Sequence, residues 1–258
     1  MHPMLTIAVR AARRGGTIIQ RARSRLHEID FDKKGKQDYV SQIDRDSEIA
    51  VIDTLLTAFP RHAIKAEESG EQGDSDHVWI IDPLDGTLNF LHGYPQFTIS
   101  IALKIKGRLD QAVVYDPILD ELFTASRGMG AQLNGQKIRA ASRSNLSHCL
   151  LATGFPVRTP EAITGCLTSF SEVLPKCSDI RRGGAASLDL AYVACGRLDG
   201  YWESGLKEWD VAAGSLLVQE SGGLVGDLSG AEKHLDSGKI IAANPRIYKQ
   251  LLPLIKTG

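Results

Sequence analysis

The sequence lacks the patterns that mark several large classes of protein. Its seven histidines are scattered and form no HExxH motif or Cys/His cluster, so a zinc site has no support. No apolar run is long enough to cross a membrane, and we expect no membrane partner. Four cysteines without a CxxC pair, in 258 residues, do not form a disulfide scaffold, so we expect a reducing, cytoplasmic setting.

Neither sign of charge dominates the chain. Lys and Arg number 30 and Asp and Glu number 31, a balance that argues against a dedicated nucleic-acid-binding protein. The apolar fraction of 43% and the charged fraction of 24% are those of an ordinary globular protein. The length suits one large domain or two fused halves.

The N-terminal segment is basic, because no acidic residue precedes Glu28 while several arginines do. An arginine-rich, acid-poor amphipathic start is typical of a mitochondrial transit peptide. Leu5, Ile18 and Ile19 nevertheless belong to an apolar side with helical spacing. We therefore favour a surface helix with a basic face.

Apolar spacing and turn residues predict an alternation of helices and strands. Helices are expected at residues 4–26, 41–59, 187–195, 211–220 and 246–255. Strands are expected at 78–81, 98–104, 111–115, 121–125, 201–203 and 240–243, with a hairpin turn at Asn134-Gly135. Residues 33–37 are expected to form a loop and residues 67–76 a polar turn region.

These elements predict an α/β protein with a more antiparallel first half and a more alternating second half. A soft boundary lies near residues 141–147. We therefore expect an N-terminal α+β half at 1–141 and a C-terminal α/β half at 142–258, with an active site completed by the second half.

The most informative segment is residues 79–90, where a buried strand ends in Asp82 and Asp85 follows three residues later. By itself, Asp-Pro-Leu-Asp-Gly is more often just a type I turn than a functional motif. Here, however, two carboxylates stand beside Gly86 and Thr87, whose backbone N–H groups suit a phosphate. Magnesium prefers such hard oxygen ligands, so the segment favours a metal-phosphate site.

Three further features have simpler interpretations. Glu67 and Glu68 form an acidic pair that is usually a solvated turn, and as neighbours on an extended chain they would not both bind one ion. Asp210 and Asp44 stand where helix-capping residues are common. The glycine-rich segment 222–226 follows a helix instead of opening one, so it is a turn and not a dinucleotide site.

The sequence resembles the inositol monophosphatase family over nearly its whole length. The resemblance rests on three motifs, in the family's order: Glu67-Glu68-Ser69, Asp82-Pro-Leu-Asp-Gly-Thr with Asn89-Phe90, and Trp209-Asp210-Val-Ala-Ala-Gly. Residues 1–5 and 181–192 resemble the bacterial extragenic-suppressor branch. The resemblance implies a layered αβαβα sandwich of the sugar phosphatase type, with an antiparallel-rich first sheet and a mixed second sheet.

The resemblance also implies a magnesium-dependent phosphomonoesterase acting on inositol 1-phosphate, sensitive to lithium. Two or three Mg²⁺ ions would activate water and stabilise the leaving alkoxide, without a phosphoenzyme. The implied metal ligands are Glu67, Asp82, Asp85 and Asp210, with the carbonyl of Leu84.

Catalytic and substrate-binding roles follow from the same resemblance. Asp44 and Thr87 would orient the attacking water, with Glu68 close by. The implied substrate-binding residues are Lys33 from the N-terminal loop, Gly86 and Thr87 at the phosphate, and Asp85, Ala186 and Glu203 at the alcohol ring. Leu88 departs from the second Thr of many members, but no metal ligation is expected from that side chain.

Two alternatives remain open. A sister phosphatase of fructose bisphosphate, histidinol phosphate or a nucleotide 3′-phosphate would carry the same metal motif. Members of the bacterial branch also join RNA polymerase antitermination complexes, for which Arg181, Arg182 and the basic first helix are the local hints. The resemblance further suggests a homodimer.

Overall fold

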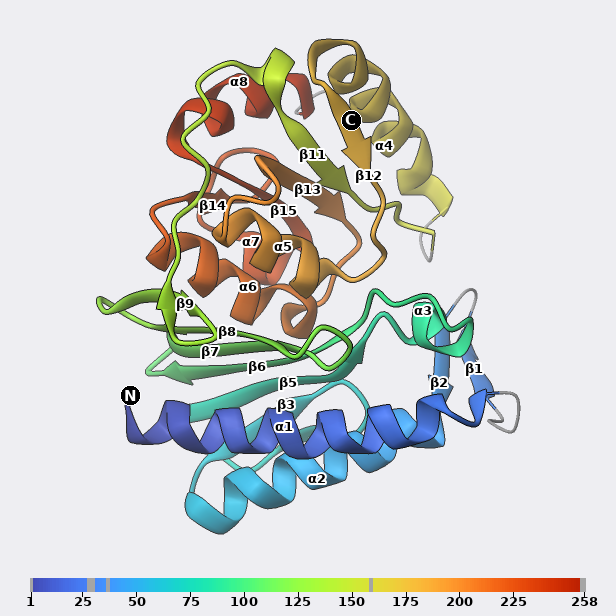
Figure 1. The fold of residues 1–258 in the computed structure, drawn as a ribbon, viewed down its shortest axis with the longest axis vertical. Helices are drawn as coiled ribbons and strands as arrows, with labels where there is room; N and C mark the ends of the chain where they lie inside the picture. The colour runs from blue at the N-terminus through green and yellow to red at the C-terminus, as the bar shows by residue number, and fades with distance from the viewer. Residues whose placement is uncertain (1, 27–30, 36–37, 158–159, 256–258) are drawn as a thin grey trace.

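The computed structural model describes residues 2–26, 31–35, 38–157 and 160–255, with side chains left out at 31–40 and 160–161. Within these residues the chain forms five layers, helices and sheets in alternation (Figure 1). This α/β architecture confirms the expected fold class.

The first sheet has eight strands in the order β10-β9-β8-β7-β6-β5-β3-β4. Its neighbours pair antiparallel, apart from the parallel pair of β3 and β5. The strands are β3 (Ala63–Ala66), β4 (Gly70–Gln72), β5 (His77–Asp85), β6 (Thr98–Ile105), β7 (Arg108–Asp116), β8 (Glu121–Ser126), β9 (Gly130–Leu133) and β10 (Gln136–Lys137).

The second sheet is mixed and has the order β12-β11-β13-β15-β14. β11 runs parallel to both β12 and β13, whereas β15 runs antiparallel to β13 and β14. Its strands are β11 (Leu150–Thr153), β12 (Asp179–Arg181), β13 (Gly200–Ser204), β14 (Leu224–Gly226) and β15 (Lys239–Ala243). The proposed division at residue 141 falls between the last strand of the first sheet and the first of the second.

The helices complete the layers. In Figure 1, α1 and α2 cover the outer face of the first sheet, α5 and α6 lie between the sheets, and α4 and α8 lie beyond the second sheet. Their bounds are α1 (Pro3–Arg23), α2 (Gln42–Ala58), α3 (Thr87–Leu91), α4 (Pro160–Val173), α5 (Ala186–Ala194), α6 (Glu208–Glu220), α7 (His234–Ser237) and α8 (Pro245–Ile255), with short 3-10 turns at Leu146–His148 and Leu174–Lys176.

Strand β5 shows why its sequence is a continuous apolar run. Alternate residues of a strand face opposite sides of the sheet. Trp79 and Ile81 pack into the cluster beneath α1 and α2, while Ile80 packs into the cluster shared with α5 and α6. A strand covered on both faces has no solvent side, so it needs no polar alternation.

The sequence-based elements are confirmed with a few corrections. The expected loop was wrong at residues 33–35, which belong to β1 (Phe31–Gly35), a strand paired antiparallel with β2 (Asp38–Ser41). Residues 36–37 lie outside the described residues. The polar composition of β1 and β2 gives no apolar alternation to reveal a strand. The acidic turn region also contains β4, and helix α4 was not anticipated.

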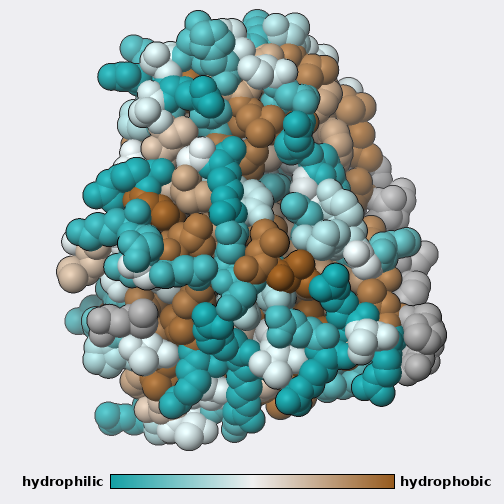
Figure 2. Space-filling model, viewed as in Figure 1, coloured by the Kyte–Doolittle hydropathy of each residue, from teal (hydrophilic) through white to brown (hydrophobic). Residues whose placement is uncertain are grey.

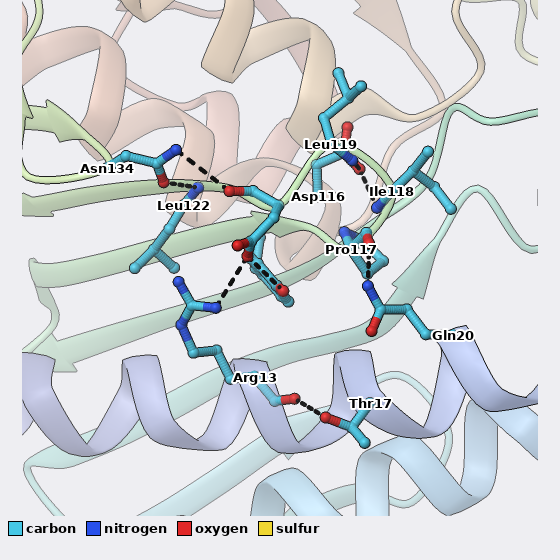
Figure 3. A network of polar contacts seen from close by, with 11 residues as sticks. Arg13, Thr17, Gln20, Asp116, Pro117, Ile118, Leu119, Leu122 and Asn134 are labelled. Carbon is cyan, nitrogen blue, oxygen red and sulfur yellow. Dashed lines mark hydrogen bonds and ion pairs between the residues drawn. The ribbon is translucent and has the colours of Figure 1, made fainter.

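A polar network ties α1 to the turns around β8 (Figure 3). Arg13 donates to Asp120 at 2.9 Å, and Gln20 donates to the carbonyl of Pro117. Asn134 accepts from the N–H of Leu122 at 2.9 Å, from a left-handed backbone with φ 48°. The predicted Asn134-Gly135 hairpin turn is confirmed, since β9 and β10 pair across it.

No helix in the described ranges has both the length and the apolar character to span a bilayer. On the face shown in Figure 2, hydrophilic side chains cover much of the surface and hydrophobic side chains appear among them. The basic first helix fits this surface, because Arg10, Arg21 and Arg23 are exposed while Leu5 and Ile19 are buried. The expected basic-faced surface helix is therefore confirmed.

Candidate active site

A cavity of about 170 Å³ lies where β5, α3, α5, β13 and α6 meet. Most of the residues singled out in the sequence line it: Glu67, Asp82, Leu84, Asp85, Gly86, Thr87, Ala186, Glu203 and Asp210. Further wall comes from Asn89, Phe155 and Arg182. Side chains far apart in the sequence are thus brought to one place by the folding of both halves.

A bulge in β5 presents two carboxylates to this cavity. Asp82 pairs with Ser100 and Asp85 with Thr98, so β5 carries one residue more than β6 over this interval. The strand therefore runs on to Asp85, and the expected end at Asp82 was wrong. The side chain of Asp82 accepts from the N–H of Leu84 at 3.0 Å, which stabilises the bend.

Burial and mutual repulsion both disfavour the ionised form of these carboxylates. Burial, and then the charges of Glu67, Asp85 and Asp210, raise the pKa of Asp82 well above its ordinary value. Burial and the charge of Asp210 raise the pKa of Asp85 to about 7, although Ser187 opposes the shift. A bound divalent cation would relieve this repulsion, so the donor set fits a hard metal ion.

The arrangement is not a closed metal cage. Among the described residues, no three Asp, Glu, His or Cys side chains already converge as ligands of a single ion. Magnesium does not require such convergence, because it retains waters and is commonly held by one or two carboxylates together with substrate phosphate.

Gly86 and Thr87 form the edge of the cavity at the start of α3. Gly86 has φ 93°, a left-handed conformation, and a Cβ there would lie 2.8 Å from the carbonyl oxygen of Gln96. Glycine at this position lets the chain turn directly into α3. The first N–H groups of a helix have no intrahelical acceptor, so Thr87 can offer its N–H to an anion.

Asp44 lies behind Thr87. Its carboxylate accepts from the N–H of Ser41 at 2.8 Å and from the hydroxyl of Thr87 at 2.7 Å. The expected capping role of Asp44 at the start of α2 is confirmed, and the same side chain contacts the cavity edge through Thr87. Burial raises the pKa of Asp44, although its hydrogen bonds act in the opposite direction.

The two neighbouring glutamates occupy different positions. Glu67 lines the cavity, whereas Glu68 is not among the lining residues. Glu48, which the sequence analysis missed, holds their turn by accepting from the N–H groups of Glu68 and Ser69 at 2.8 Å each. Glu48 is buried in α2. The one sequence feature that could have indicated its role is a carboxylate at a position of the helix that faces the core.

The second half contributes Asp210 from the first turn of α6. Asp210 is the third residue of the helix, and its carboxylate accepts from the N–H of Lys207 at 2.6 Å. The helix begins at Glu208, so the interpretation of Asp210 as the N-cap residue was wrong. A side chain at this position lies near the positive end of the helix dipole.

Glu203 projects from β13 into the same cavity. The hydroxyl of Tyr201 donates to its carboxylate, and burial is the main reason that the pKa of Glu203 rises to about 7. A Cβ on Gly154 would lie 2.0 Å from this carboxylate. Only glycine leaves room there for the glutamate.

Two residues at or beside the cavity were missed or misplaced. The N–H and hydroxyl of Ser187 donate to Asp85 at 2.7 and 2.6 Å, so the start of α5 holds a first-half carboxylate. Arg182, named above as a hint of a transcription partner, lines the cavity instead of lying on a separate surface. Its positive charge lowers the pKa of Glu203. Lys33 lies on β1, and its side chain falls outside the described part of the structure.

Comparison with known proteins agrees with this architecture. The sequence matches the inositol monophosphatase family over residues 1–257. Nus factor SuhB of Pseudomonas aeruginosa is 50% identical over 262 residues, which cover 99% of this chain and 97% of that protein. The crystal structure of extragenic suppressor protein suhB from Bartonella henselae has a TM-score of 0.97 at 43% identity, covering 100% of both chains.

A more distant solved structure carries a ligand. Staphylococcal SaIMPase-II with bound inositol monophosphate has a TM-score of 0.82 at 26% identity, covering 98% of this chain and 94% of that one. The family match spans nearly every residue, including those that line the cavity. By sequence and by fold, this chain belongs to the inositol monophosphatase family.

Proposed function

We propose that the protein is a magnesium-dependent phosphomonoesterase that hydrolyses inositol 1-phosphate to inositol and phosphate. The observation that carries the proposal is a set of four carboxylates in one cavity beside a helix start, Asp82 and Asp85 buried and Glu67 and Asp210 half-buried. Two to three Mg²⁺ ions, held by these carboxylates and the Leu84 carbonyl, would polarise the phosphate and lower the pKa of the attacking water.

Thr87 and Asp44 are suited to orient that water. If the Thr87 hydroxyl donates its single proton to Asp44, its lone pairs are left to accept a hydrogen bond from water. The buried Asp44 then polarises the hydroxyl without entering the cavity itself. We assign Glu68, on the turn beside Glu67, a supporting electrostatic role.

The phosphate and the alcohol would meet different walls. The N–H groups of Gly86 and Thr87 would bind phosphate oxygens. Ala186 and Glu203 would face the ring, where a carboxylate accepts hydrogen bonds from hydroxyls, and Asp85 would contribute from β5. Lys33 would approach from the β1–β2 hairpin.

A substrate panel tests this proposal. Purified protein is assayed with inositol 1-phosphate, fructose bisphosphate, histidinol phosphate, a nucleotide 3′-phosphate and p-nitrophenyl phosphate, with Mg²⁺, with EDTA or with added lithium. We expect the highest kcat/KM for inositol 1-phosphate, no turnover in EDTA, and inhibition by lithium. Full activity in EDTA would overturn the metal mechanism, and preference for another substrate would assign a sister activity.

A role in transcription antitermination is a second candidate function, favoured by the name Nus factor SuhB of the bacterial relative. Arg181 on β12 is exposed and pairs with Asp179 at 2.5 Å, and it lies outside the cavity lining. We expect Asp85→Asn protein to recover RNA polymerase components from lysate, and Arg181→Glu to recover fewer while keeping hydrolysis. Recovery of none by the wild type would leave the phosphatase alone.

We also propose a homodimer in the cytoplasm. The bacterial source of the relative and the four cysteines without a disulfide pattern support the location. Sedimentation equilibrium of the purified protein tests the dimer, and a single species of monomer mass would contradict it.

A further inference from the structure

Glu208, the first residue of α6, lies between two lysines of the other half. Its side chain is 12% exposed. The ammonium of Lys65 on β3 lies 3.1 Å from one carboxylate oxygen, and that of Lys104 on β6 contacts the other. The two lysine side chains are 32% and 18% exposed.

An acidic residue at a helix start is often explained by the helix dipole alone, and exposed ion pairs contribute little to stability. Neither explanation accounts for two cations from separate strands on one shielded carboxylate. Removing one partner from a largely desolvated group leaves its charge poorly compensated. The contact therefore constrains how α6 docks on the first sheet.

This docking point is next to the proposed metal ligands. Glu208 stands two residues before Asp210, and Lys65 stands two residues before Glu67. Between them, the hydroxyl of Ser100 donates to the carbonyl of Trp209 at 3.3 Å, and Ser100 is paired with Asp82 in the sheet. The first turn of α6 is thus attached to the strands from which the other carboxylates come.

We propose that Glu208 is a positioning residue, which through Lys65 and Lys104 sets the separation between Asp210 and the carboxylates of the first half. Its contacts thereby tune the affinity of the site for a divalent cation. The inference rests on the proposed metal-dependent function, because it concerns the same site.

The sign of one substitution distinguishes positioning from the simple effect of charge. Lys104→Met removes a positive charge near the site, so electrostatics alone would make cation binding tighter. If Lys104 instead holds Glu208 in place, the same change weakens binding. Glu208→Gln should weaken cation binding under both explanations, because it removes a negative charge as well as the contact. Its loss of affinity is the reference for the lysine variants.

The experiment measures Mn²⁺ binding by electron paramagnetic resonance of the free ion, since Mn²⁺ favours the same oxygen ligands. Wild type, Glu208→Gln, Lys104→Met and Lys65→Met are compared, each with a thermal unfolding curve in EDTA. The matched control is Glu121→Gln, which loses the Arg197 ion pair at 2.5 Å with a similarly shielded carboxylate, 16% exposed. Glu121 is not among the cavity lining residues.

For Glu208→Gln we expect the Mn²⁺ dissociation constant to rise about tenfold, the lower end of losses for groups that orient metal ligands. For each lysine variant we expect a smaller rise, and for Glu121→Gln no change. The KM for p-nitrophenyl phosphate at saturating Mg²⁺ should stay near that of the wild type, because the cavity edge at Gly86 and Thr87 is unaltered.

Tighter or unchanged binding by both lysine variants would overturn the positioning role. An equal loss in Glu121→Gln would also overturn it, because general destabilisation would then explain the effect. A wild type that binds no Mn²⁺ would overturn the proposed metal site itself. Normal wild-type binding with unaffected variants would overturn only the inference about Glu208.

Discussion

The two halves of the molecule build the cavity in different ways. Asp82 and Asp85 come from one bulged strand and are three positions apart, so the local backbone fixes their separation. Ala186, Glu203 and Asp210 come from α5, β13 and α6, and only tertiary contacts fix where they lie. Local geometry therefore sets the first-half carboxylates, whereas the second half depends on interactions such as that of Ser187 with Asp85.

This difference suggests a division of labour. Changes in the β5 segment should remove the chemistry itself, because the proposed metal ligands are concentrated there. Changes in the second half should alter affinity and substrate preference, because its groups approach the site from outside β5.

The largest effect is expected for Asp85→Asn in the first half. The amide is a weaker ligand without charge, but it can still accept from Ser187, so the local contacts of the fold are kept. We expect kcat to fall by at least about a hundredfold, the scale of losing one preorganised charge-stabilising group. Turnover at saturating Mg²⁺ and thermal unfolding in EDTA provide the measurements.

The unfolding temperature of Asp85→Asn should equal or exceed that of the wild type, because a repelling buried carboxylate has been neutralised. Near-normal turnover by this variant would remove Asp85 from the ligand set. It would also end the proposed contrast between the halves.

The next largest effect is expected for Gly154→Ala in the second half. The added Cβ would lie 2.0 Å from the Glu203 carboxylate, so the glutamate must move. We expect kcat/KM for inositol 1-phosphate to fall by roughly tenfold to a hundredfold, as for misplaced substrate-positioning groups. With p-nitrophenyl phosphate, which has no ring hydroxyls, the value should change little. Equal losses on both substrates would show that Glu203 does not read the alcohol.

A smaller effect concerns pH and stability. Burial raises the pKa of Glu203 to about 7 in the folded protein, from an ordinary value of 4.5. The folded state therefore binds this proton more tightly, and unfolding becomes easier as pH rises from about 4.5 to about 7. Glu203→Gln removes this contribution. The unfolding temperature of the variant minus that of the wild type should therefore increase as pH rises across that range.

Thermal unfolding of both proteins in EDTA, at intervals of pH, measures the difference. Asp82 and Asp85 remain in the variant, so its pH dependence should be reduced without being abolished. Parallel curves for the two proteins would mean that Glu203 titrates as an ordinary exposed carboxylate.

The sequence predicted the first half of the site more fully than the second. Asp82, Asp85, Gly86 and Thr87 are neighbours in the chain, so a single motif could reveal their chemistry. Ser187 acts on Asp85 only after the two halves have folded together, and Gly154 acts on Glu203 only after β11 and β13 have paired in the second sheet. No local spacing could have announced those contacts.

The same limit explains the errors in the fold. The apolar run at 78–81 predicted β5, because burial on both faces leaves a clear local pattern. The bulge that carries the strand to Asp85 depends on its register with β6, which lies beyond any single segment. Arg182 was misplaced for a similar reason: it is exposed yet also lines the cavity, and a basic residue in a chain of neutral charge gives no sign of which cavity it lies beside.

The smallest effect is expected for Arg13→Met on α1, which does not line the cavity. The Arg13–Asp120 pair has a length of 2.9 Å, but its side chains are 47% and 66% exposed. Such a pair contributes about 1 kcal/mol or less, and the contact of Arg13 with the Tyr115 ring at 5.1 Å adds little at an exposed site. The free energy of unfolding, measured in urea, should therefore fall by about 1 kcal/mol at most. Helix α1 packs on the face of the first sheet opposite α5 and α6, so Mn²⁺ binding and KM should be unchanged (Figure 1). A change in metal affinity would show that the outer face of the first sheet is coupled to the cavity. The contrast between the two halves would then be wrong, because a layer remote from the cavity would also set its affinity.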